Sequence, residues 1–286
     1  KIAEKRADRE ASEGVVLSAT TADHTYGAVI MLNCETDFVG SNADFVGAAK
    51  NFLNIAVENR IKDIEALKAF TIEGRTISEL VTDLTAKTGE KVELKHLEVI
   101  EAPYVAFYNH QGNRLSTIVG FNKSFEGIEE TAHEVAMHAA AMSPIAVDEN
   151  AIPQETKDRE MAVAIEKTKQ EQASKAVDVA LKKAGINPAH VDSEDHINSN
   201  MAKGWITEEQ AQQAREIREK VTAEALANVK EAMIQNIANG RVAKFFKENC
   251  LLDQASLLDG SMTVRQFIQK ADKEATVTAF KRVQLG

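Results

Sequence analysis

GVVLSATTADHTYGAVIMLNCE, residues 14–35, decides the fold because it sets up the first sheet of the chain. An apolar run comes first, a polar turn around Asp23, His24 and Gly27 follows, and a second run is rich in residues that favour strands. Two such runs joined by a polar turn are typical of a β-hairpin. We therefore expect an antiparallel pair of strands near the start of the core.

The sequence after this hairpin predicts two helices and two more strands. Ser41 or Asn42 can cap the first helix. Its apolar residues recur at helical spacing: Phe45, Ala49, Phe52 and Ala56. Thr76 and Glu79 form a capping box for the second helix, which should end with a left-handed cap at Gly89. The two strands are expected at VELKHLEVI (92–100) and RLSTIVGF (114–121).

Residues 149–238 consist almost entirely of good helix formers and predict two long, polar helices. The first should run from near Pro153 to Gly185, and a loop containing Pro188 and Gly204 should follow it. Thr207 and Gln210 form a capping box for the second, which should continue to Gly240. The expected apolar stripes comprise Met161, Ile165 and Val179 on the first helix and Ile217, Val221, Ala225, Val229 and Met233 on the second. The pair predicts an antiparallel helical hairpin, a coiled-coil arm inserted between globular segments.

Mixed secondary structure returns at the end of the chain. GRVAKFFKENCLL (240–252) and TVRQFIQKA (263–271) are expected as amphipathic helices, and ATVTAFKRVQL (275–285) as a half-buried strand that pairs with strands before the arm. The fold class is therefore α+β, with two small strand-plus-helix subdomains and the inserted arm. The expected bounds are 14–127 for the first subdomain, 128–148 with 239–286 for the second, and 149–238 for the arm.

Composition argues against several classes of partner. The chain has 34 basic and 44 acidic residues and a formal net charge of −10, whereas DNA, RNA and anionic membranes attract basic surfaces. No apolar run approaches the roughly 18 residues of a membrane span. Cys34 and Cys250 lie in apolar contexts typical of reduced, buried thiols. We expect a cytoplasmic protein with neither nucleic acid nor a membrane as a direct partner.

Motifs for covalent chemistry are not evident. The run HEVAMH contains His133, Glu134 and His138, but a zinc-binding HExxH motif needs histidines four residues apart on one helix face. Here they are five apart, about 140° around a helix, and Met137 occupies the expected ligand position. We expect these histidines off the packed face of their helix or at an interface. The sequence also lacks the P-loop, G-x-G-x-x-G, G-x-S-x-G and CxxC patterns, so neither an enzyme nor a bound cofactor or metal is expected.

The segment Thr36-Asp37-Phe38-Val39 stands out because it should form a tight, exposed connection between a strand and a helix cap. In one interpretation, Asp37 makes an ordinary turn hydrogen bond and Phe38 folds onto the core. In the other, a carboxylate beside a protruding aromatic side chain inserts into another protein. His110 also has two interpretations, a surface turn residue or a functional residue, and the sequence alone does not decide between them.

Several motifs in this order resemble the elongation factor Ts family. NCETDFVGSNADFVGAAKNF (33–52) is similar to the family's signature, and the similarity continues through further segments. These are AKTGEKVELKH (86–96), YNHQGNRLSTIVG (108–120), AMHAAAMSP (136–144), GRVAKFFKENCLLDQ (240–254) and ATVTAFKRVQLG (275–286). The resemblance implies a guanine-nucleotide exchange factor that binds elongation factor Tu and performs no covalent chemistry.

The resemblance also implies residue roles. Thr36, Asp37, Phe38 and Val39 match the loop that enters the partner near its magnesium and phosphate site. Thr88, Gly89 and His110 match contacts with the partner's GTPase domain, although many members have isoleucine at the position of Thr88.

Three departures from the family pattern accompany these matches. Residues 1–13 correspond to a linker remnant of a missing N-terminal helical module, and no helix follows the last strand. The arm is longer than in the best-known members, in which a shorter coiled coil helps to form a dimer. Its apolar seam could close on itself or bury against a second copy as a homodimer. The alternative is a coiled-coil scaffold or dimerisation protein without exchange activity.

Overall fold

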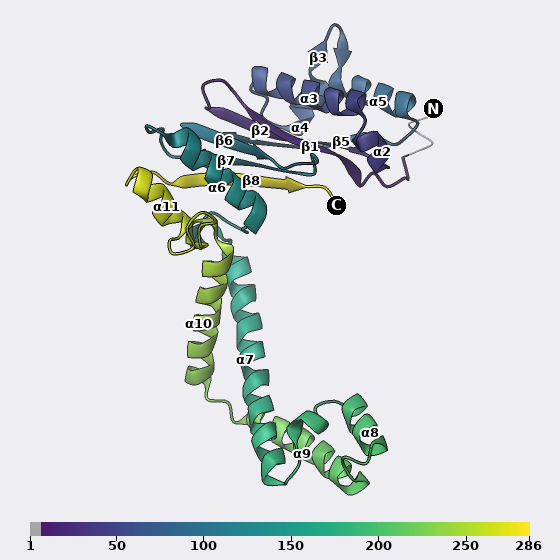
Figure 1. Cartoon of the computed structure of the whole chain (residues 1–286), viewed down its shortest axis with the longest axis vertical. Helices are drawn as coiled ribbons and strands as arrows, with labels where there is room; N and C mark the ends of the chain where they lie inside the picture. Colours follow the sequence, from purple (N-terminus) through teal and green to yellow (C-terminus); the bar gives the residue numbers. More distant parts are fainter. Residues whose placement is uncertain (1–6) are drawn as a thin grey trace. The chain divides into compact units, whose positions relative to one another are not determined.

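The computed structural model describes residues 7–286 (Figure 1). Those residues form two compact units, one made of the chain before residue 152 together with 247–286, and the other made of 152–246. The N-terminal linker proposed for 1–13 lies partly outside the described residues, and from Ala7 to Ser12 the chain has no helix or strand. The subdomain bounds given above stay a prediction.

The first sheet confirms the hairpin predicted from residues 14–35. Strands β1 (Glu13–Thr20) and β2 (Tyr26–Cys34) pair antiparallel, and β5 (Glu93–Glu101) lies on the other edge of β2. The turn between β1 and β2 is closed by the Asp23 carboxylate, which accepts hydrogen bonds from the Thr21 hydroxyl and from the Thr25 hydroxyl and backbone N–H. This anchored turn sets the register of the hairpin.

Helices cover one face of this sheet (Figure 1). They are α3 (Ala43–Glu58), α4 (Ile64–Ala69) and α5 (Ile77–Thr88), with the short strands β3 (Thr71–Ile72) and β4 (Arg75–Thr76) before α5. The Asn42 side chain caps α3, and the predicted capping box of Thr76 and Glu79 is present at α5. Gly89 ends α5 at φ 74°, the left-handed cap that the sequence predicted.

A second antiparallel sheet combines strands from distant parts of the chain, β6 (Tyr104–Asn109), β7 (Leu115–Phe121) and β8 (Val277–Gln284), in the order β6-β7-β8. The prediction that the last strand pairs with earlier ones is confirmed by the β7–β8 register. Helices α6 (Ile128–Met142) and α11 (Val264–Ala271) share a core with one face of this sheet. Short 3₁₀ turns lie at η1 (Glu149–Ala151) and η3 (Leu251–Asp253).

The other face of the second sheet packs against the first sheet. Residues from both sheets form a common apolar cluster that includes Val16, Val29, Ile118 and Val283. This unit therefore has three apolar layers, one on each outer face of the two sheets and one between them, and their close packing supports the loops at the sheet edges.

The second unit is built from helices, and the structure corrects two details of the predicted arm. The first helix, α7 (Gln154–Lys183), agrees with the prediction. The predicted loop contains η2 (Pro188–His190) and the helix α8 (Glu194–Ala202). The predicted second helix is broken at residues 228–230 into α9 (Glu208–Ala227) and α10 (Glu231–Asn249), and α10 continues through Gly240.

The apolar seam of α7 also differs from the predicted stripe. Val179 is 53% exposed, whereas the buried positions are Ala164, Thr168, Ala173, Val177 and Leu181. Val179 is two residues from Val177, about 200° around the helix, so the two side chains cannot share a face. Because the seam uses small residues, it carries a weak hydrophobic signal in the sequence.

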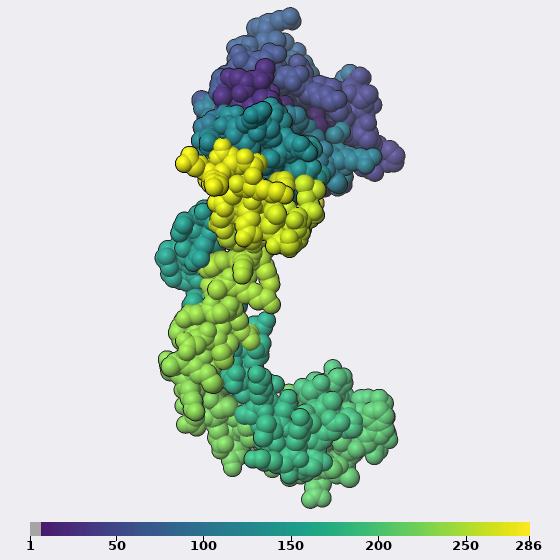
Figure 2. Space-filling model, turned by 60° about the vertical axis from the view of Figure 1, so that its left-hand side comes forward, coloured from purple at the N-terminus to yellow at the C-terminus, as the bar shows by residue number. Residues whose placement is uncertain are grey.

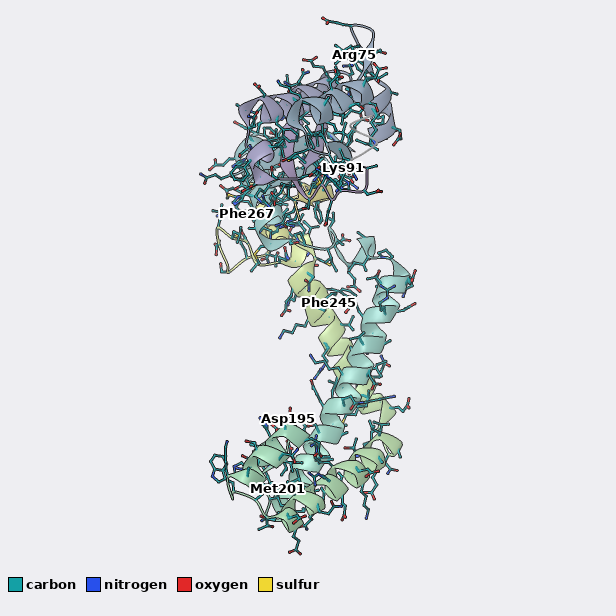
Figure 3. All side chains as sticks on the ribbon, turned by 90° about the vertical axis from the view of Figure 1, so that its right-hand side faces the viewer. Arg75, Lys91, Asp195, Met201, Phe245 and Phe267 are labelled. Carbon is teal, nitrogen blue, oxygen red and sulfur yellow. The ribbon has the colours of Figure 1, made fainter. Side chains whose placement is uncertain are left out.

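The turn between α7 and α9 has a small core of its own. Ile186, Val191, Ile197 and Ile206 are buried there, and Met201 of α8 packs against them (Figure 3). In Figure 2 the green atoms of this region form one continuous cluster. Across the described residues, no helix has the length and apolar character needed to cross a membrane.

Candidate partner-binding site

The segment singled out in the sequence forms a single helical turn, α2 (Asp37–Gly40), between β2 and α3. The Thr36 hydroxyl accepts a hydrogen bond from the Val39 N–H at 3.4 Å, and the Ser41 N–H and hydroxyl donate to the Asp37 carbonyl at 2.9 and 2.7 Å. Phe38 is 83% exposed, so the interpretation in which Phe38 folds onto the core is wrong. The side chain of Asp37 is exposed beside it.

Glu90 fixes the start of this turn, and the sequence reasoning missed it. One carboxylate oxygen accepts the backbone N–H groups of Glu35 and Thr36 at 3.0 Å each, and the other accepts the Thr36 hydroxyl at 2.6 Å. Hydrogen bonds to an ionised carboxylate are about twice as strong as neutral ones. Glu90 directly follows Gly89, so it joins the predicted contact at the end of α5 to the predicted loop.

The buried thiol of Cys34 is hydrogen-bonded to the residue that precedes α2. Its Sγ–H donates to the Thr36 carbonyl at 3.1 Å. Burial, with a smaller contribution from the negative charge of Glu90, raises the pKa of this thiol to about 12. Cys34 is therefore protonated at neutral pH, which makes it a hydrogen-bond donor and a poor nucleophile.

Two glycines permit close backbone packing at the start of β1, Gly40 between α2 and β1 and Gly14 between β1 and β2. A Cβ on Gly40 would lie 3.2 Å from the carbonyl oxygen of Gly14. Gly14 has φ +143°, and a Cβ there would lie 2.1 Å from the carbonyl oxygen of Leu32. Gly14 has no room for a side chain, and the close approach at Gly40 leaves little room for a Cβ. The turn that presents Phe38 is thus fixed by hydrogen bonds and by backbone packing.

The predicted contact at the end of α5 is built from local hydrogen bonds. The Thr88 hydroxyl donates to the Leu84 carbonyl at 2.8 Å and accepts the Glu90 N–H at 3.2 Å. Gly89 donates its N–H to the Thr85 carbonyl at 3.1 Å. These bonds hold the backbone on which Glu90 reaches Thr36.

His110 lies on the turn between β6 and β7. Its ring is exposed, and its Nδ1 is 2.9 Å from the Tyr108 hydroxyl. Arg114 on the same turn pairs with Glu13 at 2.6 Å, and that bond is the main cause of its raised pKa, to which the charge of Asp37 adds. In the described chain, the hydrogen bonds of His110 are with Tyr108, Leu115 and Asn113, and none is with α2.

Of the two histidines of HEVAMH, one agrees with the expectation that they lie off the packed face and the other does not. His133 is exposed, but His138 is 3% exposed and lies in the packed face of α6. The Gln254 amide nitrogen donates to the Glu248 carbonyl, which orients its oxygen toward His138 Nε2 at 2.9 Å. His138 Nε2 therefore carries the proton, and burial lowers the pKa of the ring. Among residues 7–286, no group of three His, Cys, Asp or Glu side chains is arranged to hold a metal ion.

Comparison with known proteins agrees with this order of motifs. The family model described as "Elongation factor TS" matches residues 35–286. The chain is 53% identical to elongation factor Ts of Phocaeicola vulgatus and 51% identical to that of Bacteroides thetaiotaomicron, in each case over 99% of this chain and 85% of the relative. It is 34% identical to elongation factor Ts of Christiangramia forsetii, over 100% of this chain and 83% of that protein.

These similarities identify a class of protein, the translation elongation factors. Within that class, the chain belongs to the elongation factor Ts family, because both the family model and the relatives match over most of its length. The match includes α2, the end of α5 and the turn that carries His110.

Proposed function

We propose that this protein is a guanine-nucleotide exchange factor for elongation factor Tu. It binds the GDP-bound GTPase and promotes GDP release by disturbing the magnesium and phosphate site, so that GTP can be loaded. The observation that carries this proposal is the 83% exposure of Phe38 on a turn held by Glu90, Thr36 and Cys34. An aromatic side chain exposed on a fixed backbone is suited to be an interface anchor, because little conformational freedom is lost when it binds.

Each predicted residue has a part in this mechanism. Phe38 inserts as an apolar wedge that displaces an element of the GTPase. Asp37 perturbs the polar network that holds the magnesium ion's water ligands, and Thr36 and Val39 present these two side chains. Removing support from the ion weakens GDP binding, since the phosphates are held largely by charge.

Thr88, Gly89 and His110 contact the GTPase domain on the second side of the displaced element. The carboxylate of Glu90 links the end of α5, which carries Thr88 and Gly89, to the start of α2. Each of these two segments therefore resists displacement of the other. The proposal assigns no proton transfer and no nucleophile to any of these residues.

The coupling is reciprocal. If the factor weakens GDP binding by a given ratio, GDP weakens binding of the factor by the same ratio. An incoming nucleotide therefore displaces the factor in turn, and the cycle needs neither a covalent intermediate nor a cofactor.

Stopped-flow release of a fluorescent GDP analogue from elongation factor Tu tests the proposal. The intact protein should accelerate release by orders of magnitude, and Phe38→Ala should lose about 30-fold, which corresponds to about 2 kcal/mol for an interface anchor. Leu258→Ala is a matched control, because Leu258 is also apolar and 59% exposed. Equal rates for Phe38→Ala and the unmodified protein would reject the wedge, and the absence of any acceleration would reject the exchange activity.

We further propose that the protein acts in the cytoplasm, without nucleic acid or a membrane as a direct partner, and that the arm can join two copies. Val163 on α7 and Met233 on α10 are 57% and 42% exposed. Sedimentation velocity tests the dimer with Val163→Glu, which should shift a dimer toward monomer. A monomer at all concentrations before substitution would exclude the homodimer.

A further inference from the structure

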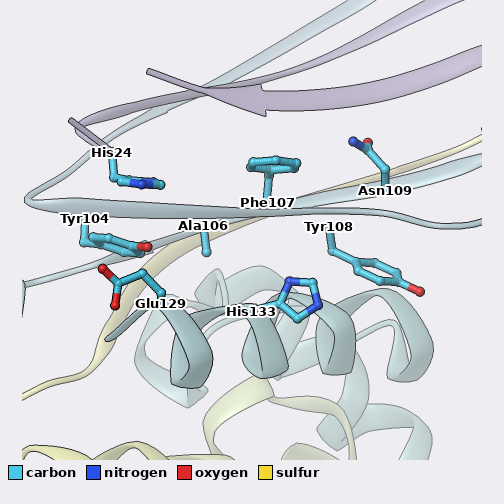
Figure 4. Close-up of a pocket in the computed structure, with 8 residues that line it drawn as sticks. All are labelled: His24, Tyr104, Ala106, Phe107, Tyr108, Asn109, Glu129 and His133. Carbon is cyan, nitrogen blue, oxygen red and sulfur yellow. The ribbon is translucent and has the colours of Figure 1, made fainter. Parts of the chain in front are cut away.

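Strand β6 and helix α6 form a pocket of about 400 Å³ that has no part in the proposed exchange mechanism (Figure 4). Along β6 the side chains of Tyr104, Ala106 and Tyr108 are directed toward α6. Phe107 and Asn109 are directed to the other side of this edge strand and, with His24, also line the pocket. Tyr104 and Ala106 are buried, so the open aromatic surface of this slot between β6 and α6 comes from the half-buried Tyr108 and the exposed His133.

Helix α6 supplies the opposite side of this slot. Glu129 and His133 are four residues apart and face the strand (Figure 4). In the part of the chain that the structure describes, the exposed carboxylate of Glu129 has neither a hydrogen bond nor an ion pair. Within the described residues, neither lysine nor arginine lines this pocket. The slot therefore presents negative charge and aromatic surface without a balancing cation.

The aromatic side chains that line the pocket are held by contacts with one another and with neighbouring residues. His24 stacks on Tyr104 with ring centroids 4.8 Å apart, and the His24 carbonyl accepts the Val105 N–H at 2.6 Å. The Tyr108 hydroxyl is hydrogen-bonded to His110, and its ring meets His133 edge to face at 5.9 Å. A ligand that enters the slot would therefore meet side chains that are already ordered.

The chemistry of the slot restricts its occupant. An anion would be repelled by Glu129, and an apolar side chain would desolvate that carboxylate without compensation. A planar guanidinium group can stack on a tyrosine face and donate two hydrogen bonds to one carboxylate, which an ammonium group cannot do in the same geometry. We propose that this slot binds the side chain of an arginine on the surface of a partner protein.

NMR titration of the intact protein with Nα-acetyl-arginine amide tests the proposal. We expect saturable shifts of the Tyr104, Tyr108 and His133 ring signals at millimolar probe. The citrulline analogue has nearly the same shape without the charge and should bind at least about tenfold more weakly, with the lysine analogue in between. Shifts that do not saturate, or equal binding of the arginine and citrulline probes, would overturn the proposal.

A pair of neighbouring substitutions locates the interaction. Glu129→Gln should raise the Kd for the arginine probe by about five- to tenfold, because it removes the charge-assisted bonds. Glu130→Gln is the matched control, since Glu130 is the next residue of α6, is exposed and does not line the pocket. The same Kd in both variants would refute the role of Glu129. The titration contains no GTPase, so its outcome is independent of the exchange activity proposed above.

Discussion

Removal of the Glu90 carboxylate should loosen the α2 turn while the sheet beneath it stays folded. Glu90 accepts three hydrogen bonds from Glu35 and Thr36, and each is worth about 1 kcal/mol as a neutral bond and about 2 kcal/mol when charge-assisted. Glu90 is half-buried, so water recovers part of this energy after truncation. We expect Glu90→Ala to lower the free energy of local opening by about 3 kcal/mol, and Glu90→Gln, whose amide oxygen still accepts two bonds, by about 1 kcal/mol.

Native-state hydrogen exchange measures this opening directly. The Thr36 amide should exchange about 100-fold faster in Glu90→Ala and about fivefold faster in Glu90→Gln, while amides of the β1–β2 pair keep their protection. Glu93→Gln is the matched control, since Glu93 lies on the adjacent β5 and pairs with Lys91 and Lys95 rather than with the turn. If the Thr36 amide exchanged at the unmodified rate in Glu90→Ala, the assignment of Glu90 as the anchor would be refuted.

Three further predictions concern stability. Gly14→Ala should lower the free energy of unfolding by about 3 kcal/mol or more in urea denaturation, because its Cβ would lie 2.1 Å from the Leu32 carbonyl oxygen at φ +143°. Gly47→Ala in α3, where a Cβ meets nothing within 4 Å, should be neutral or stabilising, and similar losses in both would contradict the steric argument. His138 has a lowered pKa in the folded protein, so the unfolded chain binds the proton more readily and stability should fall as pH falls below about 6.5, by at most about 1.4 kcal/mol per pH unit. Denaturation at several pH values should show a shallower fall for His138→Gln, and identical slopes would exclude His138 as the cause. Leu181→Ala should destabilise the 152–246 unit by about 2–5 kcal/mol, because it leaves a cavity in the core of that unit. Amide exchange should become faster in α7 and α9 and stay unchanged in β1 and β2. Equal acceleration in both units would show that they unfold together.

The parts of the fold that the sequence predicted well depend on local chemistry. The capping box of Thr76 and Glu79 and the left-handed cap at Gly89 each involve residues within one helical turn, so their signals lie side by side in the sequence. Strand alternation near the end of the chain also indicated β8 and its need for a partner. These features survive folding because neighbouring residues alone determine them.

The features that were missed depend on residues that are distant in the sequence or on weak apolar signals. Glu90 anchors Thr36 from 54 residues away, and nothing in the sequence alone distinguishes it from other surface carboxylates. The burial of His138 depends on Gln254, 116 residues later. In the arm, Ala, Glu and Lys favour helix on both sides of residues 228–230, so propensity gave no indication that the helix ends there.

The same distinction between local and distant determinants applies to the two sites. The sequence left open whether Phe38 is exposed or folds onto the core, and it gave no indication of the bonds that make its turn rigid. The slot beside α6 needs the alternation of β6 together with the face of a helix that begins some 20 residues after it. Each element is visible in the sequence, but their juxtaposition comes from the packing of the sheet.

The pairing of β8 with β7 has a consequence for synthesis of the protein on the ribosome. More than 150 residues separate Phe121 at the end of β7 from Val277 at the start of β8. At translation rates of about 5–20 residues per second, β7 emerges roughly 8–30 s before its partner strand exists. During that interval the β6–β7 hairpin has an open edge, and the apolar side chains that later meet β8 lack a cover. The nascent chain is therefore most vulnerable to aggregation while the arm is being made, and completion of the final strand ends that period.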